Sequence, residues 1–190
     1  MRPRYTTVRL VLAALPVMLL LACQSAPTRT YTLYATPGSA SKEYGGPALR
    51  VDSVHMPATI DRIEIMLDVA PGELKISDFD HWSAPLGEMA RQTLSQDLIL
   101  RMPPGKVIFP HLLKPSGALG ITVDILNFRT DRGDAQLTAS WTILPQAADA
   151  ASRGGSVSLS TPNSNGGALD TVRALSTLLG QLADRIVAGL

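Results

Sequence analysis

The chain has 190 residues, of which 45% are hydrophobic, and it carries a formal net charge of +1 and a single cysteine. A chain of this length is long enough for one domain with a sizeable core. With a single cysteine, a disulfide within the chain is impossible. Arg2, Arg4 and Arg9 are three of the 17 basic residues, so the chain after residue 22 has 14 basic and 16 acidic side chains, a net charge of −2. No basic stripe remains there, which argues against a nucleic-acid partner.

The N-terminal segment has the layout of a secretory signal that ends in a lipidation site. Three arginines precede an apolar run from Leu10 to Leu21, which is shorter than the ~20 residues that a bilayer-spanning helix needs. The sequence Leu20-Leu21-Ala22-Cys23 resembles the lipobox of bacterial lipoproteins, in which the cysteine thiol is lipidated and becomes the mature N-terminus. We therefore predict a cleaved lipoprotein signal peptide over 1–22 and lipidation of Cys23.

A short polar tether follows the cysteine. Residues 24–30 are mostly small and polar, and seven extended residues reach about 25 Å. The folded domain, predicted over 31–190, should therefore lie close to the membrane that holds the lipid anchor. In the sorting rule familiar from enterobacteria, Asp directly after the cysteine retains a lipoprotein at the inner membrane. Gln24 at this position favours the periplasmic face of the outer membrane.

Alternating apolar and polar residues predict β-strands along most of the domain. They are expected over 31–34, 49–55, 63–67, 73–76, 106–109, 119–129, 135–143 and 155–160. The runs 119–129 and 135–143 flank a short turn that contains Asp and Gly, the clearest hairpin signal in the chain.

Two stretches have the apolar spacing of amphipathic helices. The first is expected to be capped by Ser83 and to end before Pro103, and the second to be capped by Asp170 and to continue through Ile186. The predicted fold is a single α+β domain in which an antiparallel sheet of about five or six strands carries both helices on one face.

The sequence contains no convincing catalytic, metal or cofactor site. Asp78, Asp80 and His81 form an acidic cluster with one histidine, but we interpret it as a polar turn before the first helix rather than a metal site. No serine lies in a nucleophile-elbow pattern, and no glycine-rich phosphate loop is present. We therefore expect a protein that is not an enzyme and needs no cofactor.

Three short motifs occur in order after the cysteine. They are Tyr31-Thr32-Leu33, the stretch Pro57-Ala58-Thr59-Ile60-Asp61-Arg62, and His81-Trp82-Ser83-Ala84-Pro85-Leu86 before the first helix. Together they resemble the auxiliary lipoproteins of ABC-type transporters, the family that includes the paraquat-inducible protein C lipoproteins.

That resemblance implies an accessory component of an MCE-domain lipid transporter that links the inner and outer membranes. The implied partners are the membrane, through the lipid anchor, and a periplasmic MCE-domain protein; a homo-oligomeric ring is also compatible with it. The residues that match the motifs, and are therefore candidate interface residues, are Asp61, Arg62, Trp82 and Leu86.

Two other functions stay open from the residues alone. One is a scaffolding or assembly lipoprotein for an outer-membrane barrel, which would be recovered with that barrel. The other is a periplasmic carrier of lipid or a small ligand, which would need an apolar cavity between the helices and the sheet. A hydrolase is the least supported alternative, because it requires a Ser-His-acid arrangement that no motif indicates.

Overall fold

The computed structural model describes residues 26–38, 43–70, 73–131, 133–145, 151–163 and 166–190. The predicted signal peptide and Cys23 lie outside the described residues. The elements in chain order are β1 (Arg29–Tyr31), β2 (Leu49–His55), β3 (Glu64–Ala70), β4 (Glu73–Trp82), α2 (Leu86–Ile99), β5 (Val107–Ile108), β6 (Leu119–Asp131), β7 (Asp134–Leu144), β8 (Arg153–Pro162) and α3 (Ala168–Ala188). In this part of the chain no helix is long and apolar enough to cross a bilayer.

The strands form two sheets. The larger has the order β5-β2-β6-β7-β8 and the smaller the order β1-β4-β3. The α+β class and the two helices are confirmed, but the strands divide between two sheets, and both contain parallel pairs: β2 runs parallel to β5 and β6, and β1 runs parallel to β4. Side-chain alternation has a period of two in either direction, so it does not reveal strand polarity.

The predicted hairpin is confirmed over its full length. Strands β6 and β7 pair in antiparallel register, with Val123 opposite Trp141. The turn between them includes Gly133, whose φ of 92° lies in the left-handed region that glycine adopts without strain. Strand β8 continues the sheet on the far side of β7 in antiparallel register.

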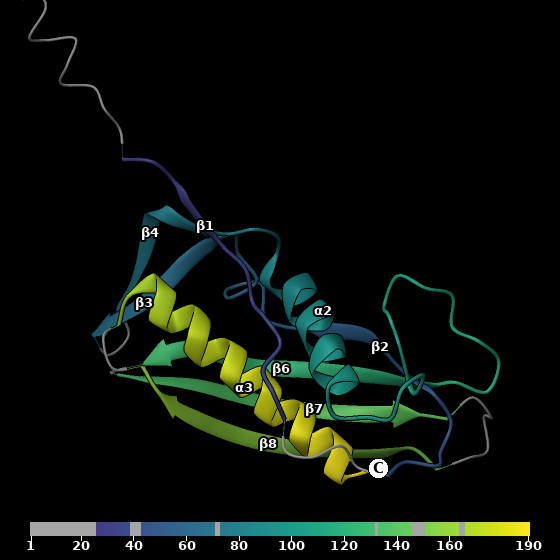
Figure 1. The fold of residues 1–190 in the computed structure, drawn as a ribbon. Coiled ribbons are helices and arrows are strands. Elements are labelled where there is room, and N and C mark those ends of the chain that lie inside the picture. Colours follow the sequence, from purple (N-terminus) through teal and green to yellow (C-terminus); the bar gives the residue numbers. More distant parts are fainter. Residues whose placement is uncertain (1–25, 39–42, 71–72, 132, 146–150, 164–165) are drawn as a thin grey trace, which may run out of the picture.

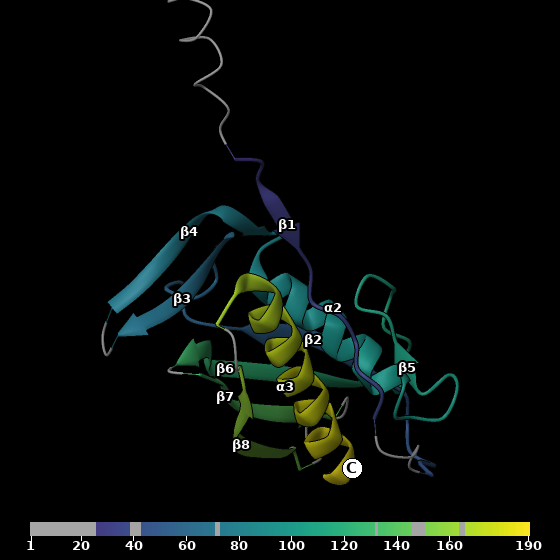
Figure 2. The ribbon, with the colours of Figure 1, turned by 60° about the vertical axis from the view of Figure 1, so that its left-hand side comes forward.

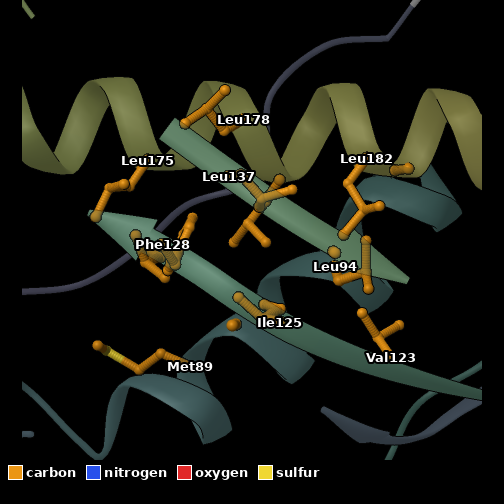
Figure 3. Close-up of a cluster of buried hydrophobic side chains, with 14 of the residues drawn as sticks. Met89, Leu94, Val123, Ile125, Phe128, Leu137, Leu175, Leu178 and Leu182 are labelled. Atoms are coloured by element: carbon orange, nitrogen blue, oxygen red, sulfur yellow. The ribbon is translucent and has the colours of Figure 1, made fainter. Parts of the chain in front are cut away.

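Both helices cover one face of the five-stranded sheet (Figure 1). Alternate residues of β7, including Leu137, are buried toward them. The apolar stripe of α3 meets this face, and Leu175, Leu178 and Leu182 lie above Phe128 and Leu137 (Figure 3). Alternation along the strands and helical spacing along α3 therefore produce a single core between these two layers.

Both predicted helix caps are wrong. The residue before α2 is Pro85, and no side chain at that position caps the helix. Helix α3 begins after Gly167, and Asp170 lies inside its first turn, where it accepts a hydrogen bond from Arg173. In each case the sequence contains an ordinary capping residue within three positions of the true start, and the local pattern does not choose between neighbouring starts.

Candidate anchoring and docking site

Strand β1, the first strand of the domain, is held to its neighbour β4 by a buried carboxylate. Arg29 pairs in register with Asp80, and its Nε and Nη2 donate to the two carboxylate oxygens of Asp80 at 2.8 and 3.1 Å. Ser77 Oγ donates to the same carboxylate at 2.8 Å. Burial by itself raises the pKa of Asp80, but the hydrogen bonds from Arg29, Ser77 and Tyr31 outweigh it and hold the pKa below its usual value. The ionised side chain thus fixes the start of the folded domain to β4.

Beyond β1 the chain continues as a strap, residues 32–38, that runs along the two helices (Figure 1). The backbone N–H of Tyr34 donates to Ser176 Oγ on α3 at 3.3 Å. The N–H of Thr36 donates to Asp97 Oδ1 on α2 at 2.8 Å, and Leu33 is 5% exposed. Side chains of both helices therefore satisfy backbone donors of the strap and hold it in place.

Arg101 joins the strap to both helices. Its side chain is 2% exposed and donates to the carbonyl of Thr36 at 3.0 Å, to Asp97 Oδ1 at 3.2 Å and to Asp184 Oδ1 at 2.6 Å. Burial raises the pKa of Asp97 to about 6, against the hydrogen bond from Thr36 and the charge of Arg101. All partners of this buried pair are structural, so we assign it to holding the strap rather than to catalysis.

The four candidate interface residues meet where the smaller sheet joins α2. Trp82 and Leu86 are 4% and 3% exposed and belong to the core. Asp61 Oδ1 accepts the backbone N–H of Gly87, in the first turn of α2, at 2.9 Å. Arg62 donates to Glu64 at 3.2 Å, and both side chains are more than a third exposed. In this fold Trp82 and Leu86 are buried, whereas the side chain of Arg62 is 43% exposed.

The acidic cluster before α2 is in a strand, not in the predicted turn. Asp78, Asp80 and His81 belong to β4, and Asp80 is occupied by Arg29. No group of three or more His, Cys, Asp or Glu among the described residues is arranged to hold a metal ion.

Two exposed apolar clusters have no counterpart in the sequence analysis. One lies on and beside β4, where Ile63, Leu74, Ile76 and Phe79 are 42–52% exposed. The other follows β5, where Leu113 is 93% exposed and Leu112 49%. The alternation around Leu74 and Ile76 indicated a strand, but its burial depends on where the smaller sheet lies relative to the rest of the domain.

A pocket of about 510 Å³ lies at one end of the five-stranded sheet. It is lined by residues that include Tyr44, Leu119, Ile143, Arg153 and Leu190. The layer between the helices and the sheet is occupied by core side chains instead (Figure 3). The pocket is therefore not the cavity between the two layers that a lipid carrier was expected to have.

Comparisons with known proteins agree with this architecture. Residues 31–187 match the family model described as "ABC-type transport auxiliary lipoprotein component". The crystal structure of an uncharacterized protein superimposes with a TM-score of 0.69 at 18% identity, covering 85% of this chain and 97% of that one. The crystal structure of a Xanthomonas campestris protein, described as a member of DUF330, gives a TM-score of 0.60 at 18% identity and covers 82% and 92% of the two chains. No curated protein sequence matches the chain significantly.

Proposed function

The chain belongs to the family of ABC-type transport auxiliary lipoprotein components, and on that premise we propose that it is an outer-membrane lipoprotein serving an MCE-domain, ABC-type lipid transporter. In this role it is a non-enzymatic accessory component that links the transporter to the outer membrane. The observation that carries the proposal is the family match over 31–187, which begins eight residues after Cys23. Almost all of the chain beyond the anchor thus consists of the family domain.

The anchor in this proposal is a lipidated Cys23 at the periplasmic face of the outer membrane. The signal layout and Gln24 support it, and several acyl chains are needed for lasting attachment. Cells supplied with labelled palmitate test it directly. The wild-type protein should carry the label and fractionate with the outer membrane, while Cys23→Ser should lose both properties. A Cys23→Ser protein that is still labelled, or a wild-type protein found with the inner membrane, would contradict this part.

The partner in this proposal is the periplasmic MCE-domain protein. The test is affinity purification of the lipidated protein from native membranes, followed by mass spectrometry. Recovery of an MCE-domain protein with ABC or membrane subunits is the expected result. Recovery of only an outer-membrane barrel, or of this protein alone, would overturn it and favour the scaffolding alternative.

Arg62 offers a sharper form of the same experiment. Its side chain is 43% exposed and is paired with Glu64 at 3.2 Å. Arg173 on α3 is a matched control, because it is 59% exposed and is paired with Asp170 at the same distance. If Arg62 contacts the transporter, Arg62→Glu should reduce the recovered MCE-domain protein and Arg173→Glu should not. Equal recovery with both variants would remove Arg62 from the interface.

A further inference from the structure

Strands β3 and β4, residues 64–70 and 73–82, form an arm that leaves the rest of the domain (Figure 2). The base of the arm is buried, with Trp82 4% and Asp80 6% exposed. Farther out along β4 the apolar side chains are open to solvent: Leu74 and Ile76 are each 44% exposed, and Phe79 is 42% exposed. The arm thus presents large apolar side chains where an exposed hairpin would ordinarily carry polar ones.

Two of these exposed side chains, Leu74 and Ile76, are neighbours on the surface of the arm. Leu74 and Ile76 pair with consecutive alternate positions of β3, so they lie on one face of the hairpin. Ile63, which directly precedes β3, is 52% exposed. Neighbouring exposed apolar residues such as Leu74 and Ile76 are typical of surfaces that bind another protein or a membrane.

The anchor lies within reach of this surface. Arg29 is in register with Asp80, and Leu74 lies six positions before Asp80 along β4. Six extended residues span about 20 Å. The chain from Cys23 to Arg29, where β1 begins, also spans six residue-to-residue distances, so when extended it too reaches about 20 Å. A membrane that holds Cys23 is therefore close enough to touch the exposed part of the arm.

The second exposed apolar cluster does not share this position. Leu112 and Leu113 follow β5, and in both ribbon views that loop lies on the opposite side of the domain from the arm (Figures 1 and 2). Only the arm, of these two clusters, adjoins the strand where the tether enters the fold.

We propose that the arm rests on the lipid surface to which the protein is anchored, with Leu74 and Ile76 in the interfacial region. The proposal rests on the lipid anchor at Cys23. Strands β3 and β4 contain one lysine, Lys75, against five acidic residues, Glu64, Asp68, Glu73, Asp78 and Asp80, so the arm has no positive charge to attract anionic headgroups. The contact is therefore apolar: it needs no anionic lipid, and on vesicles without anionic lipid it should not depend on salt. It fixes the orientation of the domain and turns the Leu112–Leu113 loop away from the membrane.

Site-specific fluorescence on the full-length lipidated protein tests this contact. Cys23 is the only native cysteine, and lipidation consumes its thiol, so Leu74→Cys and Ile76→Cys each provide one reactive site for an environment-sensitive NBD label. Leu113→Cys is the matched control. The proteins are placed in phosphatidylcholine vesicles, with or without phosphatidylglycerol, that contain no other protein.

On vesicles without phosphatidylglycerol, the expected result is a blue-shifted emission at positions 74 and 76 and a loss of fluorescence with spin-labelled lipids, at low and high salt alike. Position 113 should remain water-exposed. Amide exchange of the unsubstituted protein should slow in the arm when it is on vesicles. The proposal would be overturned if the labels at positions 74 and 76 were as accessible to water as the label at position 113 and the amide exchange of the arm did not change on vesicles.

Other occupants of the surface give distinguishable results. Protection that appears only as the density of protein on the vesicle rises would assign the arm to a second copy, and protection only after adding transporter would assign it to that partner; both overturn the proposal. If the wild-type protein does not stay on the vesicles, both the lipid anchor and the arm contact are wrong. If the protein stays on the vesicles but the arm remains exposed to water, only the arm contact is wrong.

Discussion

The carboxylate of Asp61 accepts a hydrogen bond from the backbone N–H of Gly87 at 2.9 Å, although the residues are 26 positions apart. Helix α2 begins after a proline and has no cap of its own, so Asp61 supplies the missing acceptor from the preceding turn. This contact joins the second family motif to the residue that directly follows the third. It gives Asp61 a role in folding that does not require a partner.

Removal of this cap should cost a measurable amount of stability. Asp61→Ala is expected to lower the free energy of unfolding by about 1 kcal/mol, the usual cost of losing an N-terminal cap. Arg62→Ala breaks only the exposed ion pair with Glu64 and should change the free energy of unfolding by less than about 0.5 kcal/mol. Urea unfolding of the lipid-free Cys23→Ser protein measures both. Equal effects of the two variants would contradict the capping role.

The core between helices and sheet should be intolerant of truncation. Phe128 is 2% exposed, whereas Phe79 on the arm is 42% exposed. We expect Phe128→Ala to cost about 3–5 kcal/mol, because it removes buried area and leaves a cavity. Phe79→Ala should cost far less in solution. The comparison uses the same substitution and the same unfolding assay, and a similar loss at both positions would show that the arm is packed rather than exposed.

Asp97 should make stability fall as pH rises through the weakly acidic range. Burial raises its pKa in the folded protein from 3.8 to about 6, so the folded state holds this proton more tightly than the unfolded state. The associated stability is complete below pH ~4 and is lost as the pH rises through ~6. Asp97→Asn removes this dependence.

The measurement is the unfolding free energy of both proteins from pH 4 to 7. Wild type should lose stability relative to Asp97→Asn between pH 4 and 6. Asp80, whose pKa is lowered, has the opposite dependence, but it is present in both proteins and cancels in the difference. A constant difference across this range would show that Asp97 is ionised throughout.

The close approach of the strap to α3 should reverse the usual benefit of alanine in a helix. A Cβ on Gly180 would meet Thr36 Oγ1 directly and Arg101 Nη2 at 3.1 Å. A change from glycine to alanine in a helix interior normally stabilises the folded protein by about 1 kcal/mol. Gly180→Ala should instead destabilise it by about 1–3 kcal/mol through overpacking.

Two comparisons check the cause of that loss. In a Thr36→Ala background the effect of Gly180→Ala should largely disappear, because the oxygen that the new methyl group would meet is gone. Gly87→Ala in α2 meets only the Asp61 carboxylate at 3.5 Å, an ordinary contact, and should be neutral or stabilising. Additive effects of Gly180→Ala and Thr36→Ala would rule out the strap as the source.

Elements with a long, regular pattern were predicted well, and their boundaries were not. The β6–β7 hairpin follows from alternation and a turn with glycine, and α3 follows from its continuous apolar stripe. The caps at Ser83 and Asp170 failed because several nearby residues satisfy the same local rule. His81, expected in a turn, is paired in β4, because strand pairing across the sequence outweighs a weak local preference.

The sequence by itself determined the α+β class, the regular elements and the family motifs, because periodicity and short motifs are local properties of the chain. It also carries the prediction of a lipidated Cys23. The tertiary structure decided strand polarity, the burial of Trp82 and Leu86, the capping of α2 by Asp61 and the exposure of Leu74 and Ile76. Each of these depends on which distant segment lies beside a residue, and that position is set only when the layers pack together.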